Sequence, residues 1–70
     1  MKYVGLKQVL KAVENDEVNK VYIGKDAEQH IINSIKNACY NKKIEIIEID
    51  SMSELGKMSG IEVEAATAAE

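Results

Sequence analysis

Three polar residues near the start of the chain have the types and spacing to bind an anionic, hydrogen-bonding partner. Lys7 and Lys11 lie one turn apart if this segment is helical, and Gln8 lies beside them. Two such ammonium groups suit adjacent phosphates or guanine acceptors, and the glutamine amide can both donate and accept a hydrogen bond. Because lysine and glutamine are also common on exposed helices, an ordinary solvated face is the alternative for this segment alone.

An amphipathic helix over about residues 6–15 is the element expected to position these side chains. Its inward face has the i, i+3, i+4, i+7 spacing of Leu6, Val9, Leu10 and Val13. The three polar residues fall outside this stripe, so the core does not need them. The helix follows Gly5, and the exposed amides and dipole of such a helix start favour a phosphate.

The apolar patterns farther along predict alternating strands and helices. We expect a buried strand at 21–23 that ends at Gly24, then a helix that Asp26 caps with Gln29 and that ends near residues 41–43. The inward stripe of this helix is Ile31, Ile32, Ile35, Ala38 and Cys39. A strand follows with one strongly apolar face, made by Ile44, Ile46, Ile47 and Ile49, and with Glu45 and Glu48 outward.

The next cap is expected at Ser51 and Glu54, and it begins a short third helix that Gly60 ends. Helices and strands that alternate within one short domain favour an α/β sandwich with a mostly parallel or mixed sheet. No repeat, linker or low-complexity tract divides the chain.

The composition is that of a folded protein without a general affinity for nucleic acid. Hydrophobic residues make up 46% and charged residues 30% of the 70 positions, and the formal net charge is −3. A surplus of negative charge opposes nonspecific phosphate binding. One face can still be locally basic, because salt screens charges over about 8 Å. All nine basic residues are lysines, so the bidentate fork of arginine is absent.

Several other classes of protein have no support in the sequence. No long apolar run follows the first residues, so we expect neither a signal peptide nor a membrane span. The protein is therefore expected to be cytoplasmic. The single cysteine, Cys39, excludes an intrachain disulfide and the multi-cysteine spacings of zinc sites. No phosphate-binding or dinucleotide-binding glycine motif occurs, so no cofactor and no metal are expected.

A small hydrolase that uses His30 or Cys39 is the enzymatic alternative. Both residues fall in the same predicted helix, separated by about 13 Å of rise, which is too far for a hydrogen-bonded nucleophile and base. Cys39 belongs to the apolar stripe, and His30 is expected in an exposed first turn. The sequence therefore favours a protein without catalytic activity.

A second segment, residues 60–65, alternates small or apolar residues with acidic ones. Considered alone, this pattern predicts an edge strand or a loop with Ile61 and Val63 in the core. Gly56, in the short helix expected before this segment, is of the type that permits close packing or a backbone approach.

Together, the two segments closely resemble the kink-turn-binding ribosomal protein family, the L7Ae family. Residues 5–11 match the pattern G-x-K-Q-x-x-K, and residues 55–66 match L-G-K-x-x-G-I-E-V-x-A-A. The motifs have the order and spacing of one fold, and the resemblance extends from Gly5 to Ala69. It implies a final strand at 65–69 and a three-layer α/β/α sandwich with a small mixed sheet, as a single domain over residues 1–70.

The resemblance also implies which residues bind RNA. In this family the helix start enters the widened groove of a kink-turn, a sharply bent RNA element built on tandem sheared G·A pairs, and contacts the guanines. Gly5, Lys7, Gln8 and Lys11 match this recognition motif position by position. Relatives from archaea and eukaryotes often have Asn and Glu where this chain has Lys7 and Gln8, whereas bacterial members commonly have the Lys-Gln version. The sequence is therefore expected to belong to the bacterial branch.

In the same family a loop lies against the RNA, with apolar residues near the extruded nucleotide of the bend. The matching residues here are Ile61, Glu62 and Val63, and Lys57 is a candidate phosphate contact. The implied function is non-catalytic stabilisation of kink-turns in ribosomal RNA or in a regulatory mRNA leader. The resemblance also implies association with the ribosome, and neither DNA nor a membrane is an expected partner. The acidic balance and the lack of arginine favour the alternative, a protein-binding α/β module of the same fold without useful RNA affinity.

Overall fold

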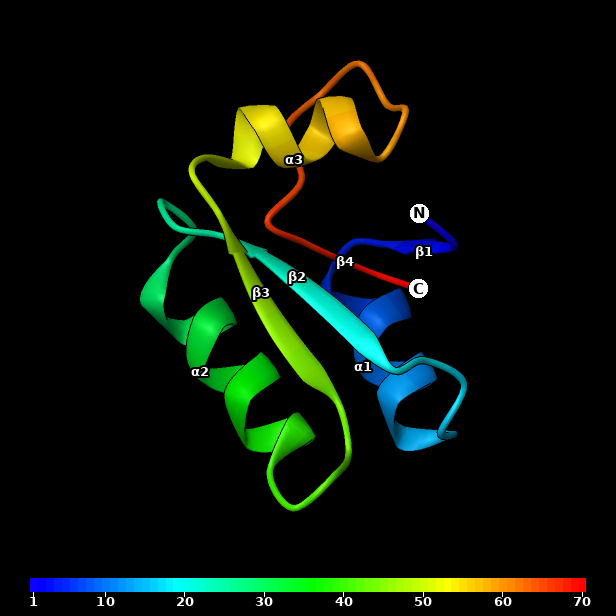
Figure 1. Cartoon of the computed structure of the whole chain (residues 1–70). Helices are drawn as coiled ribbons and strands as arrows, with labels where there is room; N and C mark the ends of the chain where they lie inside the picture. The colour runs from blue at the N-terminus through cyan, green and yellow to red at the C-terminus, as the bar shows by residue number, and fades with distance from the viewer.

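A computed structural model describes all 70 residues as a four-stranded mixed sheet with helices on both faces (Figure 1). Helices α1 and α2 cover one face, and α3 covers the other. The elements in chain order are β1 (Tyr3–Val4), α1 (Leu6–Glu14), β2 (Lys20–Gly24), α2 (Gln29–Cys39), β3 (Glu45–Ile49), α3 (Met52–Met58) and β4 (Thr67–Ala69). This arrangement confirms the predicted three-layer α/β/α sandwich.

The strand order in the sheet is β1-β4-β2-β3. Strands β2 and β3 are parallel, as their connection through α2 requires. Strand β4 runs antiparallel to both β1 and β2 and lies between them, with Ala68 opposite Val4 on one side and opposite Tyr22 on the other. The predicted final strand is therefore present, but it covers Thr67–Ala69 and not the whole of residues 65–69. The two-residue strand β1 had no signal in the sequence, because it is defined only by pairing with β4.

Alternate residues of β2 supply the two halves of the core. Val21 and Ile23 join the cluster under α1 and α2, which also contains Val9, Val13, Ile35, Cys39 and Ala69. Tyr22 points to the opposite face, where it packs with Leu55 of α3 and with Ala65 and Ala68. The predicted inward stripe of α1 is confirmed, since Val9 and Val13 are buried and the two leucines pack against them.

Strand β3 corrects one expectation, because its isoleucines do not share a single apolar face. Ile44 and Ile46 pack against the cluster under α1 and α2, whereas Ile47 and Ile49 pack against the cluster under α3. Side chains alternate along a strand, and helices cover this sheet on both sides, so both faces must be apolar. Glu45 and Glu48 are exposed, as predicted.

Asp26 corrects a second expectation. Helix α2 begins later, at Gln29, and Glu28 at its N-cap makes no side-chain capping bond. Asp26 Oδ1 instead accepts a hydrogen bond of 2.7 Å from the backbone N–H of Met52, the first residue of α3. The predicted cap at Ser51 is confirmed, because its hydroxyl accepts from the N–H of Glu54 at 3.0 Å. Helix α3 thus has two caps, one of them from a distant turn.

Candidate nucleic-acid interface

The start of α1 presents free backbone donors. Gly5 is its N-cap, with φ 97° and ψ 154°, a conformation that glycine adopts without strain. The Gly5 carbonyl accepts the N–H of Val9 at 3.0 Å, so the N–H groups of Leu6, Lys7 and Gln8 precede the first intrahelical bond. No acidic side chain occupies the first turn. The positive end of the helix dipole is therefore open to an anion.

The three polar side chains of α1 are exposed, as predicted. Neither Lys7 nor Lys11 forms an ion pair, so both ammonium groups are free to meet a partner. Gln8 Oε1 accepts a long contact of 3.5 Å from the N–H of Val4, which leaves the amide nitrogen free to donate. The structure thus places these residues on one accessible face, and their role in binding stays a prediction.

The second segment is a loop pressed against α3. Gly60 has φ 78° and ends the helix, and the N–H of Ile61 turns back to the carbonyl of Gly56 at 3.1 Å. The N–H of Ala65 closes the loop on the carbonyl of Met52 at 3.0 Å. A Cβ on Gly56 would collide with the carbonyl oxygen of Val63. The backbone approach that the sequence suggested for Gly56 is confirmed.

The apolar residues of this loop have different surroundings. Ile61 is half-buried and packs against the cluster of Tyr22, Leu55, Ala65 and Ala68. Val63 is 70% exposed, so the interpretation that both residues lie in the core is wrong for Val63. The packing of Ile61 anchors the loop at 61–64, and the side chain of Val63 is left exposed to solvent.

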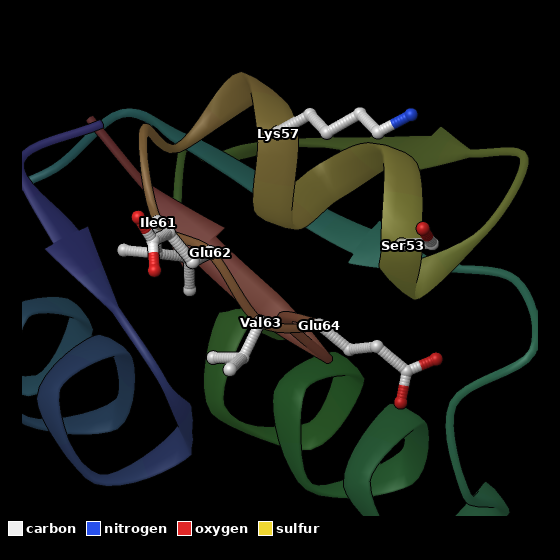
Figure 2. Close-up of a pocket in the computed structure, with 6 residues that line it drawn as sticks. All are labelled: Ser53, Lys57, Ile61, Glu62, Val63 and Glu64. Carbon is white, nitrogen blue, oxygen red and sulfur yellow. The ribbon is translucent and has the colours of Figure 1, made fainter.

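Lys57 lies in the last turn of α3 and, with Ser53 and residues 61–64, lines a hollow of about 380 Å³. Figure 2 shows Lys57 extending away from Ile61 and Glu62, and Glu64 pointing away from Val63. Glu62 and Glu64 are exposed. The loop surface thus combines an exposed valine with charges of both signs that point in different directions.

A hydrogen bond connects the two segments. The N–H of Gly5 donates to the carbonyl of Thr67 at 3.0 Å, where the chain leaves the loop and enters β4. Thr67 is completely buried, and its hydroxyl donates to the carbonyl of Tyr22 at 2.8 Å. Thr67 had no recognised signal in the sequence, although it is the one polar residue in the run 65–69. The structure therefore joins the helix start to the end of the loop.

The chemically reactive side chains do not form a second site. His30 is exposed and contacts Glu28 at 3.3 Å, whereas Cys39 is buried in the core at the other end of α2. Burial raises the pKa of the Cys39 thiol, an effect that Lys42 partly offsets, so the reactive thiolate is disfavoured. The chain has no group of three or more His, Cys, Asp or Glu residues that could hold a metal ion.

The other perturbed group, Tyr22, is structural. Its hydroxyl donates to Glu70 Oε2 at 2.6 Å. This hydrogen bond is the main cause, and burial a smaller one, of a raised pKa for the Tyr22 hydroxyl.

None of the three helices has the length and apolar character that a bilayer crossing requires.

The fold and the exposed helix start define a small α/β protein of the kind that the two motifs indicate, and comparisons with known proteins agree. Residues 3–70 match the model of the ribosomal protein L7Ae/L30e/S12e/Gadd45 family. The chain is 60% identical over 67 residues to the RNA-binding protein TTE2299 of Caldanaerobacter subterraneus subsp. tengcongensis. The aligned residues cover 96% of this chain and 82% of that protein. It therefore belongs to this family.

Other relatives agree with this assignment. The RNA-binding protein BH0128 of Halalkalibacterium halodurans is 50% identical over 66 residues, which is 94% of this chain and 80% of that protein. The predicted family and its bacterial version are thereby confirmed.

Two solved structures have the same fold. They are the Giardia lamblia 15.5kD RNA binding protein and a protein with unknown function from Bacillus halodurans C, each with a TM-score of 0.85 and 27% identity. Each match covers 94% of this chain, but it covers 56% of the first protein's chain and 66% of the second's. The chain thus spans less than two thirds of these two structures.

Proposed function

We propose that this chain is a non-catalytic RNA-binding protein that recognises and stabilises kink-turns in ribosomal RNA or in a regulatory mRNA leader in the cytoplasm. The observation that carries the proposal is the Gly5–Thr67 hydrogen bond, which holds the open helix start beside the end of the loop. The family membership and the names of the relatives, several of which are RNA-binding proteins, support the same function.

The helix start supplies the polar part of the proposed interface. The free amides after Gly5 suit a phosphate, and Lys7 and Lys11 extend this positive surface along one face of α1. Gln8 can donate from its amide nitrogen to a guanine acceptor while its oxygen faces Val4. With no arginine in the chain, base recognition at this surface uses lysine and glutamine alone.

The loop supplies the apolar part. The exposed aliphatic surface of Val63 suits an unstacked base, and half-buried Ile61 supports the loop from below. Glu62 contributes a hydrogen-bond acceptor, and Lys57 contributes a phosphate contact at the border of the hollow. The acidic side chains limit the general attraction of the loop for RNA, which favours a specific shape over any phosphate backbone.

Bending of the RNA follows from the rigidity of this arrangement. A protein that binds only the kinked form stabilises that form by its differential affinity, so a sparsely populated bend becomes the dominant state. No chemical step is required of the protein.

A titration with two matched RNAs tests the proposal. The first RNA is a short kink-turn, and in the second the tandem G·A pairs are replaced by Watson–Crick pairs. We expect tight binding to the first RNA and weak binding to the second, and a higher melting temperature of the protein with saturating kink-turn RNA. Equal, weak binding to both RNAs would contradict the proposal and favour a protein-binding module.

Lysine variants locate the interface on the protein. Replacing Lys7 or Lys11 by glutamine should weaken binding and reduce the slope of log affinity against log salt by about one unit each. Lys20→Gln is the matched control, because Lys20 is exposed, forms no ion pair and lies at the start of β2. Equal losses for all three variants would indicate a nonspecific attraction.

A further inference from the structure

The turn between α2 and β3 displays an aromatic side chain that the fold does not use. Tyr40 is 76% exposed, more than the other exposed large hydrophobic residues, Met58 and Val63. It forms the C-cap of α2 with φ −60° and ψ 134°, and Asn41 continues the turn with φ 62°. The ring belongs to neither core cluster. A large apolar surface is thus open to a partner.

The turn that carries Tyr40 is firmly anchored. Lys42 Nζ donates to the carbonyl of Val13 at 3.1 Å and to Asp16 Oδ1 at 2.8 Å, both at the end of α1. The N–H of Lys42 also donates to the carbonyl of Cys39 at 3.0 Å. Because the backbone on both sides of the ring is held, binding to Tyr40 would require little ordering of the turn.

The charges around Tyr40 favour an anionic partner only weakly. Lys36 lies one turn earlier on α2 and Lys43 follows in the turn, and both are exposed and without an ion pair. Lys42 is neutralised by Asp16, and the carboxylate of Glu45 and the negative end of the α2 dipole oppose the lysines. Stacking on the ring would therefore supply most of the affinity.

The position of the turn places Tyr40 within reach of a strand that leaves the proposed interface. The Lys42 contacts fix the turn at the end of α1 opposite to Gly5, and Figure 1 shows it at the end of the molecule away from α3. The length of α1 is about 13 Å, from the rise per residue of an α-helix. A stacked strand that advances about 3.4 Å per nucleotide covers this distance in about four nucleotides.

We propose that Tyr40, with Lys36 and Lys43, is a second RNA contact that stacks on an unpaired nucleotide flanking the bound kink-turn. The proposal rests on the proposed function for its RNA, and it adds a binding site distant from Lys7, Gln8 and the loop at 61–63. A tyrosine ring stacks on any base, so the site selects single-stranded RNA and not a sequence.

Kink-turn RNAs with single-stranded extensions test this site. The extensions are placed at each end of the kink-turn in turn. One of about two nucleotides is too short to reach Tyr40, and one of about eight nucleotides is longer than the roughly four that the distance requires. We expect the longer extension at one end to improve affinity by about fivefold or more, from the stacking of one base. Tyr40→Ala should abolish the gain without weakening binding to the short RNA, and Tyr40→Phe should retain it.

Equal affinity for the short and long RNAs would overturn the proposal, as would a gain that persists in Tyr40→Ala. Lys36→Gln and Lys43→Gln should each reduce the gain. Lys25→Gln is the matched control, because Lys25 is exposed and follows Gly24, at the end of β2 opposite to the turn, with only a long contact of 3.8 Å to Asp50. If Tyr40 binds a protein and not RNA, neither the extension nor the substitution of Tyr40 changes the RNA affinity. That result overturns the proposal.

A fluorescence measurement separates this site from the proposed function. The chain contains no tryptophan, so Tyr40→Trp introduces a single tryptophan at the turn, and its emission can be excited selectively over that of the remaining tyrosines. Quenching by a single-stranded oligouridylate without a kink-turn would support stacking at this site even if the kink-turn titration failed. Unchanged emission with both the oligouridylate and the long kink-turn RNA would overturn the stacking proposal, whatever the outcome at the helix start.

Discussion

The two parts of the proposed interface are built on different principles. At the start of α1 the candidate side chains are exposed and the helix places them, so the residues that hold the structure and those offered to a partner are separate. In the loop after α3, Ile61 packs against the core and also lies close in sequence to the exposed Val63. Gly56 has no side chain, so the backbone of the loop at Val63 can pack directly against α3. Substitutions in the loop should therefore affect stability and binding together, whereas those on the helix face should affect binding alone.

The largest effect is expected from Gly56→Ala. The new Cβ would collide with the backbone carbonyl of Val63, which cannot move without displacing the loop. We expect a loss of about 3 kcal/mol in the free energy of unfolding. The melting temperature should fall by more than about 10 °C, measured by thermal denaturation.

Gly60→Ala is the matched control for this loop. A Cβ at Gly60 meets nothing within 4 Å, so only the strain of φ 78° remains, at about 1 kcal/mol. If Gly56→Ala were as mild as Gly60→Ala, the loop would not be fixed by contact with α3.

Gly5→Ala should have the next largest effect, and for a conformational reason. The space around a Cβ at Gly5 is empty, but φ 97° with ψ 154° is strained for any L-residue by about 2 kcal/mol. Chemical denaturation should show this loss of stability. Because the strain pulls the helix start away from Thr67, kink-turn affinity should fall as well. An unaltered affinity would show that the helix start need not keep its place beside β4.

Ile61→Ala and Val63→Ala divide the loop into supporting and presented residues. Ile61→Ala removes half-buried packing and should cost about 1.5 kcal/mol of unfolding free energy, whereas Val63→Ala should change it by less than about 0.5 kcal/mol. Both variants should bind kink-turn RNA more weakly. Urea denaturation and RNA titration of the same samples check the division, which an equal loss of stability for the two variants would contradict.

The smallest effect on stability is expected for the double variant Lys7→Gln with Lys11→Gln. Both side chains are exposed and form no ion pair, so the free energy of unfolding should change by less than about 0.5 kcal/mol. The loss of RNA affinity should nevertheless be the clearest of the series at low salt. A marked loss of stability would mean that these lysines have structural partners in solution.

Local patterns in the sequence predicted the helix of the interface well. The spacing of Leu6, Val9, Leu10 and Val13 defines the buried face of α1 without reference to the rest of the fold, and the cap at Ser51 likewise depends on neighbouring residues alone. The exposure of the candidate lysines follows from the same periodicity. Features set within one or two helical turns were therefore predictable.

Features set by remote segments were not predictable in the same way. The partner of Asp26 is the N–H of Met52, and the division of the isoleucines of β3 between two faces depends on where α3 docks. The contrast between Ile61 and Val63 arises because the loop turns back on Gly56, which the alternation of residue types does not show. The family resemblance supplied what the periodicity lacked, most clearly the final strand.

The position of β4 in the middle of the sheet has a kinetic consequence. This strand follows every other element along the chain, yet it must enter between β1 and β2, and its first residue receives the hydrogen bond from Gly5. Contacts between segments so far apart in sequence form slowly, because the long intervening loop must close first. During synthesis, a nascent chain that has not yet released β4 from the exit tunnel would carry the lysines of α1 without the strand that anchors them. The helix start would then take its place in the proposed interface only after β4 has paired with β1 and β2.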